Sequence, residues 1–101
     1  MFKLKPDATF VATIDIPNGG MPLPLKVEFR RKRAAEIQEW IEASKTIKGV
    51  DALLEIVVGW KDVDSEYSPA AFAELLQAYP GSELAIYLGF LRALSGAERK
   101  N

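Results

Sequence analysis

The sequence contains no cysteine and no histidine. Without cysteine the chain has no disulfide, no thiolate nucleophile and no cysteine-bound metal. Without histidine it lacks the commonest general base and metal ligand, which leaves carboxylates, lysines and tyrosines for any chemistry. A glycine loop of the kind that cradles phosphates and a G-x-S-x-G motif are missing as well. These absences predict a protein that is not an enzyme and that holds neither a cofactor nor a metal.

Strong charge of one sign and long apolar runs are also missing. The 13 basic and 14 acidic residues give a net charge of -1, which is too balanced for the broad positive field that draws proteins to nucleic acid. No stretch approaches the roughly 20 apolar residues that span a bilayer, and the opening MFKLKPDATF has no apolar run of signal-peptide length. We therefore expect a cytoplasmic protein that binds neither nucleic acid nor membranes.

The length and composition are those of an ordinary folded domain. Of the 101 residues 49% are hydrophobic and 27% are charged, a mixture typical of globular proteins rather than disordered ones. No serine- or glycine-rich linker, internal repeat or low-complexity segment divides the chain. We predict a single domain over residues 1–101.

The first third of the chain alternates between apolar and polar residues, which is the period of half-buried strands. TFVATIDI at 9–16 and LPLKVEFR at 23–30 each place their apolar residues on one side. The intervening PNGGMP supplies residues that tolerate positive φ between prolines that end a strand ladder. The pattern predicts an antiparallel β-hairpin over about 8–30, with these inward residues: Phe10, Ala12, Ile14, Ile16, Leu25, Val27 and Phe29.

After residue 33 the hydrophobic period becomes that of helices. Ile37, Trp40, Ile41 and Ser44 recur three and four residues apart, which predicts a helix over about 34–45. The segment VDALLEIVVGW at 50–60 is apolar on more than one stripe. It therefore predicts a second helix that is largely buried.

Start and stop signals indicate two more helices. A serine oxygen can accept from the first-turn amides and a proline at the first helical position gives up no needed donor, so Ser68-Pro69 predicts a helix start. Pro80-Gly81 ends that helix, and Ser82 is positioned to cap a fourth helix over about 83–95 that Gly96 closes.

Together these elements predict an α+β fold, in which the N-terminal antiparallel β-hairpin is followed by a four-helix, mostly helical region over about 34–96. Since a lone hairpin is marginal in water, we expect it to pack on these helices or to pair with the strands of another chain.

The segment GWKDVDSEYSP places three acids at alternate positions, Asp62, Asp64 and Glu66, as calcium loops do at their start. A calcium loop starting at Asp62 would need glycine at its sixth position and glutamate at its twelfth, where this chain has Tyr67 and Ala73. A catalytic carboxyl pair would need desolvation to raise one pKa, which a hydrophilic loop does not provide. We interpret the acids as part of a solvated loop between helices.

Two other features admit more than one reading. The basic run at 30–33 could contact phosphates together with Lys26, but such a run is more typical of a solvated strand-to-helix junction. The fourth helix is apolar nearly all round, as central helices and contact surfaces both are. Gly89, unfavourable in mid-helix, indicates that another backbone approaches closely there, in the same chain or in a second one.

Several segments taken in order resemble the tail assembly chaperones of tailed bacteriophages and prophages. They are the opening MFKLKPDATF, the later VEFRRKR, the segment LLEIVVGWKDVDSEYSPAAFAELLQAYPG, and the closing helix with its short charged tail. The resemblance covers nearly the whole chain, and GWKDVDSEYSP leading into AAFAELLQAYPG is its most specific part.

The resemblance implies a non-enzymatic protein of the host cytoplasm that binds the aggregation-prone tape-measure protein during tail morphogenesis and is absent from the mature virion. It also implies a longer form made by ribosomal frameshifting in many members. Amphipathic helices can cover the apolar stripes of such a client, and an exposed hairpin edge would allow self-association. The family offers no motif of catalytic residues to carry over, so we select candidates for client contact by apolar excess: Trp40, Ile41, Tyr87, Phe90, Leu91 and Leu94.

Two alternatives remain open at this point. One is a small structural tail or head-tail component that stays in the particle. The other is a nucleic-acid-binding regulator that uses the basic run, which the balanced charge and the lack of a helix-turn-helix signature disfavour.

Overall fold

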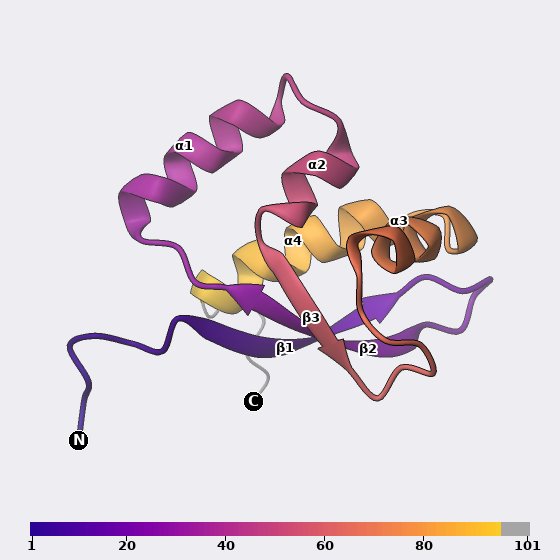
Figure 1. The fold of residues 1–101 in the computed structure, drawn as a ribbon, viewed down its shortest axis with the longest axis horizontal. Helices are drawn as coiled ribbons and strands as arrows, with labels where there is room; N and C mark the ends of the chain where they lie inside the picture. Colours follow the sequence, from indigo (N-terminus) through magenta and orange to yellow (C-terminus); the bar gives the residue numbers. More distant parts are fainter. Residues whose placement is uncertain (96–101) are drawn as a thin grey trace.

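The computed structural model of the chain describes residues 1–95 and shows a three-stranded sheet with helices packed over one face (Figure 1). The strands are β1 (Thr9–Ile16), β2 (Leu23–Arg30) and β3 (Val57–Lys61). The helices are α1 (Ala34–Ser44), α2 (Gly49–Leu54), α3 (Pro69–Ala78) and α4 (Ser82–Ser95). The sheet order is β1-β2-β3 and both pairings are antiparallel. The expected helix end at Gly96 lies outside the described residues.

The predicted hairpin is confirmed, both in its bounds and in which side chains point toward the core. β1 and β2 pair from Thr9 opposite Arg30 to Ile16 opposite Leu23. The inward side chains are buried or half-buried along both strands, while the alternate positions of β1 are largely exposed. In the connecting loop Gly19 and Gly20 adopt positive φ values of 57° and 101°, the conformation that glycine enters without a steric penalty.

The helix expected over 50–60 is wrong in its second half. It ends at Leu54, and residues 57–61 form β3, which pairs with β2 through Val27 opposite Trp60 and Glu28 opposite Gly59. β-Branched residues at 56–58 favour a strand. The hydrophobic period of a short apolar run fits a helix or a strand, and here burial next to β2 decides for the strand. The α+β class is thus correct, but the sheet has three strands rather than two, and the chain is less helical than expected.

The core lies between the sheet and α4, which crosses the face of β1 (Figure 1). The rings of Phe29 and Phe90 lie 5.2 Å apart, and Phe10 stacks on Phe90 at 6.2 Å. Gly89 faces the side chain of Ile14, which occupies the space that a Cβ would need. The close approach expected at Gly89 is therefore within the chain, and a side chain rather than a backbone makes it.

Helices α1 and α2 are joined to this core by Trp40. Its indole Nε1–H donates to the carbonyl of Ala52 at 2.9 Å, and its ring contacts Tyr87 at 5.1 Å and the edge of Phe90 at 5.3 Å. A buried indole that finds an acceptor satisfies its only donor, so this one residue ties α1 to both α2 and α4.

The two predicted serine caps have different outcomes. Ser68 Oγ accepts from the backbone N–H of Ala71 at 3.0 Å and Pro69 begins α3, as predicted. The prediction for Ser82 is wrong, because Ser82 is the first residue of α4 itself, and its N–H donates to Tyr79 at 3.0 Å. Its Oγ is buried and has no hydrogen-bond partner among the described residues.

Candidate partner-binding surfaces

The acidic loop after β3 folds back on Trp60. Trp60 Nε1–H donates to the carbonyl of Ser65 at 2.8 Å, and Ser65 Oγ donates to Asp64 at 3.3 Å. Asp62 adopts a positive φ of 60° and pairs with Lys26 on β2 at 3.0 Å. Residues 1–95 contain no group of three or more His, Cys, Asp or Glu side chains able to share a metal ion. The carboxylates of this loop are solvent-exposed, which confirms a solvated loop. The expectation that it joins two helices is wrong, because residues 57–61 form β3 and the loop therefore joins β3 to α3.

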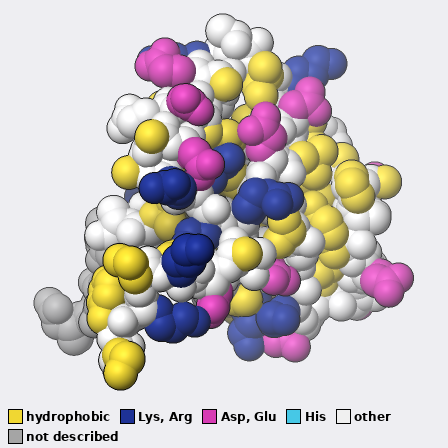
Figure 2. Space-filling view, turned by 60° about the vertical axis from the view of Figure 1, so that its left-hand side comes forward, with side chains coloured by type: hydrophobic (Ala, Val, Ile, Leu, Met, Phe, Trp, Pro, Cys, Tyr) yellow, Lys and Arg dark blue, Asp and Glu magenta, His cyan; other side chains and the backbone are white. Residues whose placement is uncertain are grey.

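The basic run joins β2 to α1 and makes several hydrogen bonds within the chain. Arg30 Nε donates to the carbonyl of Glu55 at 3.1 Å, and Arg31 Nε donates to that of Asp7 at 2.8 Å. The Arg31 guanidinium also lies over the ring of Phe10, 5.1 Å from its centroid. Figure 2 shows one face of the molecule, on which lysines and arginines gather across the middle with carboxylates beside them. These contacts favour the structural reading, a strand-to-helix junction.

The six partner-binding candidates fall into two groups in the structure. Phe90 is 0% exposed and Trp40 is 3% exposed, so both are core side chains with little surface to offer a partner. Ile41, Tyr87, Leu91 and Leu94 are half-buried and pack against the rim of the core. Any binding role for the six therefore rests on the second group.

The four half-buried candidates lie along the neighbouring helices α1 and α4. On α4 the positions 84, 87, 91 and 94 follow the spacing of one helical stripe. Two shallow cavities accompany the stripe, one of about 390 Å³ beside Leu91, Leu94 and Ile37, the other of about 320 Å³ beside Tyr87 and Leu84. We call this surface the α1–α4 face and define it by six residues: Ile37, Ile41, Leu84, Tyr87, Leu91 and Leu94.

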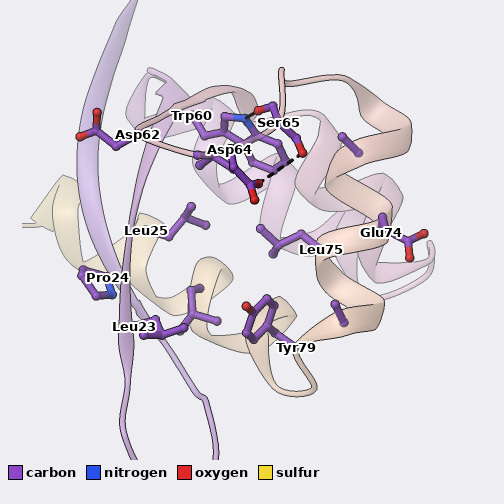
Figure 3. Close-up of a pocket in the computed structure, with 14 residues that line it drawn as sticks. Leu23, Pro24, Leu25, Trp60, Asp62, Asp64, Ser65, Glu74, Leu75 and Tyr79 are labelled. Carbon is purple, nitrogen blue, oxygen red and sulfur yellow. Dashed lines mark hydrogen bonds between the residues drawn. The ribbon is translucent and has the colours of Figure 1, made fainter.

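A second apolar surface was missed from the sequence. A groove of about 340 Å³ lies between α3 and the end of the sheet where β1 finishes and β2 starts (Figure 3). Leu25 and Leu75 point toward one another across it, and Tyr79 closes it near Leu23. Its apolar lining comes from Ile16, Leu23, Pro24, Leu25, Trp60, Val63, Ala71, Leu75, Ala78 and Tyr79. We call it the α3–sheet groove.

The rim of the α3–sheet groove is acidic. Its lining includes Asp62, Asp64 and Glu74, and among the described residues it includes no lysine or arginine. Asp64 and Glu74 form no ion pair with any described residue. The groove therefore combines an apolar floor with uncompensated negative charge at its edges.

Tyr67 packs against Trp60, which lines this groove. Its hydroxyl donates to the carbonyl of Val57 at 3.1 Å, and its ring meets Trp60 edge-on at 5.2 Å. Burial disfavours the charged phenolate and raises the pKa of Tyr67 above 10.0.

The described part of the chain has no helix that is both long enough and apolar enough to cross a bilayer. A family model described as phage tail assembly chaperone matches residues 1–101. Comparison with curated proteins gave no match, and comparison with solved structures gave none either.

Proposed function

Because this chain belongs to the family of phage tail assembly chaperones, we propose that its client is the tape-measure protein during tail morphogenesis. The chaperone acts in the host cytoplasm, keeps the client soluble until the tail tube forms around it, and is absent from the mature virion. A longer form of the chain, made by ribosomal frameshifting, would be a further partner in the same assembly.

We assign client binding to the α1–α4 face. The observation that carries this assignment is the stripe of Leu84, Tyr87, Leu91 and Leu94 along α4, in which Leu84 remains 61% exposed although α4 also forms the core. Covering exposed apolar surface contributes about 25 cal/mol per Å². A long helical client presents apolar side chains at the same three- and four-residue spacing, so its helices fit beside α1 and α4 as in helix-in-groove recognition.

The assignment is tested by co-expression with the tape-measure protein of the same phage or prophage, a long protein, followed by co-purification and mass determination. The test variant is Leu84→Asp with Leu91→Asp, which places two carboxylates on the α1–α4 face. Gln77→Asp is the matched control, since it adds a carboxylate at an exposed position of α3 outside both surfaces.

We expect the wild-type chain and the control to recover soluble client, and the double variant to recover at least tenfold less while its helical circular dichroism is kept. Equal recovery by a folded double variant would refute the assignment to this face. If wild-type chain elutes alone while the long protein precipitates, the client role itself is refuted. Stoichiometric amounts of this chain in purified virions would instead identify a structural tail component.

A further inference from the structure

We propose that the α3–sheet groove of one copy binds the N-terminal arm, residues 1–6, of a second copy. The chain would thereby associate head to tail through two different surfaces. The inference concerns binding between copies without any client, so it stands apart from the proposed client role.

The N-terminal arm exposes large apolar side chains that the fold of its own chain leaves uncovered. Phe2 is 91% exposed and Leu4 is 92% exposed. Lys3 and Lys5 alternate with them, so an extended arm places the apolar pair on one side and the two lysines on the other. Its base is fixed, because the backbone N–H of Arg31 donates to Ala8 at 2.8 Å.

The α3–sheet groove complements this arm in both apolar character and charge. Phe2 and Leu4 would lie on the apolar floor between Leu25 and Leu75, which face each other across the groove (Figure 3). The lysines on the other side of the arm would then lie at the rim near the carboxylate of Asp64 (Figure 3), with Lys3 exchanging its exposed ion pair with Asp7 for this contact. Complementary charge of this kind fixes the orientation and register of a bound segment.

The arm points away from the groove of its own chain. It leaves the sheet at Thr9, whereas the groove lies at the Ile16 end of β1, and the N-terminus and α3 are on opposite sides of Figure 1. Leu25 on the groove floor lies opposite Ile14, five strand residues beyond Thr9 and so roughly 17 Å from it at about 3.3 Å per residue. Leu4 is five residues before Thr9, and five residues reach at most about 18 Å, so Leu4 would meet Leu25 of its own chain only if the arm folded back fully extended along the sheet. The arm instead runs the other way in Figure 1, which favours a second copy as the occupant.

The two contacting surfaces differ, so the contact is heterologous. Each copy has one arm and one groove, and a contact of this type repeats until it closes as a ring or continues as an open chain. This arrangement predicts either closed rings, of which two copies that exchange arms are the smallest, or open oligomers whose mass rises with concentration.

The test is sedimentation velocity of the full-length chain over a range of concentrations. The arm variant is Phe2→Ser with Leu4→Ser. The groove variant is Ala78→Arg, which puts a bulky cation at an exposed position in the groove lining. Gln77→Arg is the matched control, because it adds the same charge at the neighbouring exposed position outside the lining. All four positions are exposed, so the variants should fold, which circular dichroism checks.

We expect the wild-type chain and the control to associate, and each variant alone to remain monomeric. A mixture of the arm variant and the groove variant should form a 1:1 complex and nothing larger, since one supplies the only intact groove and the other the only intact arm. Wild-type chain that stays monomeric, an arm variant that associates like wild type, or a mixture without the complex would each overturn the proposal.

A synthetic MFKLKP peptide gives a second readout that is independent of oligomer size. It should bind the arm variant, whose groove is intact, with an affinity that falls at least tenfold in the groove variant and falls with added salt. Equal binding to both variants would place the peptide elsewhere and overturn the assignment to the groove.

Discussion

A methyl group added at Gly89 tests the packing of α4 on the sheet. In the structure the new Cβ of Gly89→Ala would overlap Cδ1 of Ile14 and lie 3.4 Å from its Cγ1. Ile14 is 2% exposed and belongs to the core, so its side chain has little room to turn away. The substitution therefore sets two effects of opposite sign against each other.

The magnitudes of these effects can be compared. Replacing glycine by alanine in a helix interior favours folding by about 1 kcal/mol, whereas overpacking a core disfavours it by about 1–3 kcal/mol. We expect a net loss of about 1 kcal/mol for Gly89→Ala. Ile14→Val, which removes Cδ1, should cost about 0.5–1.5 kcal/mol by itself. In the double variant the overlap is gone, so it should be at least as stable as Ile14→Val.

The assay is urea unfolding followed by tryptophan fluorescence, with all four members of the cycle measured together. We expect a coupling energy of about 1–3 kcal/mol between the two positions. Gly49→Ala is the matched control, since the three atoms nearest its Cβ belong to the exposed, flexible side chain of Glu83, which can move aside, so the fold should not be destabilised. Additive effects of Gly89→Ala and Ile14→Val would refute the contact between α4 and β1 described above.

Three further substitutions test polar groups in and around the core. Ser82→Ala should raise the free energy of unfolding by about 1 kcal/mol, because it removes a buried hydroxyl without a partner. Ser68→Ala should lower the free energy of unfolding by about 1 kcal/mol, because the α3 cap is lost. If urea unfolding shows that Ser82→Ala is less stable than the wild-type chain, the first expectation is contradicted. The raised pKa of Tyr67 means that its phenol ionises first in the unfolded chain, so wild-type stability should fall as pH rises past about 10. Tyr67→Phe should show a smaller fall in alkaline urea titrations, and an unchanged pH dependence would count against this account.

The parts of the fold that the sequence predicted are those whose signals are local. The alternation in β1 and β2 depends on period alone, and the start of α3 depends on Ser68-Pro69 and a single hydrogen bond. β3 was missed because VVGWK is a short apolar run that suits a helix or a strand equally well by period. Its pairing with β2, whose residues lie 28 to 35 positions earlier, decides the outcome.

The binding surfaces were less predictable because they depend on which side of a helix the rest of the chain covers. Phe90 and Leu91 are neighbours of equal apolar character, yet Phe90 is fully buried against Phe29 while Leu91 is half-exposed. The α3–sheet groove brings together residues 16–25, 60–65 and 71–79, and no single segment carries a signal for it. The sequence shows the alternating acids after Trp60, two of which, Asp62 and Asp64, line the groove. Only the fold shows that they lie beside apolar side chains from α3 and the sheet.

The positions of the two proposed surfaces determine whether they can be used together. The arm leaves one end of the long hairpin, the α3–sheet groove lies at the other end, and the α1–α4 face is formed by helices above the sheet (Figure 1). Association through the ends therefore need not cover the face assigned to the client. Copies joined in a row would present that face repeatedly, which matches the repeated apolar stripes of a long helical client. If each site binds weakly, linking the copies raises the effective concentration of every site after the first. Removing the arm should then weaken client binding through lost avidity, whereas charging the α1–α4 face removes the contact itself.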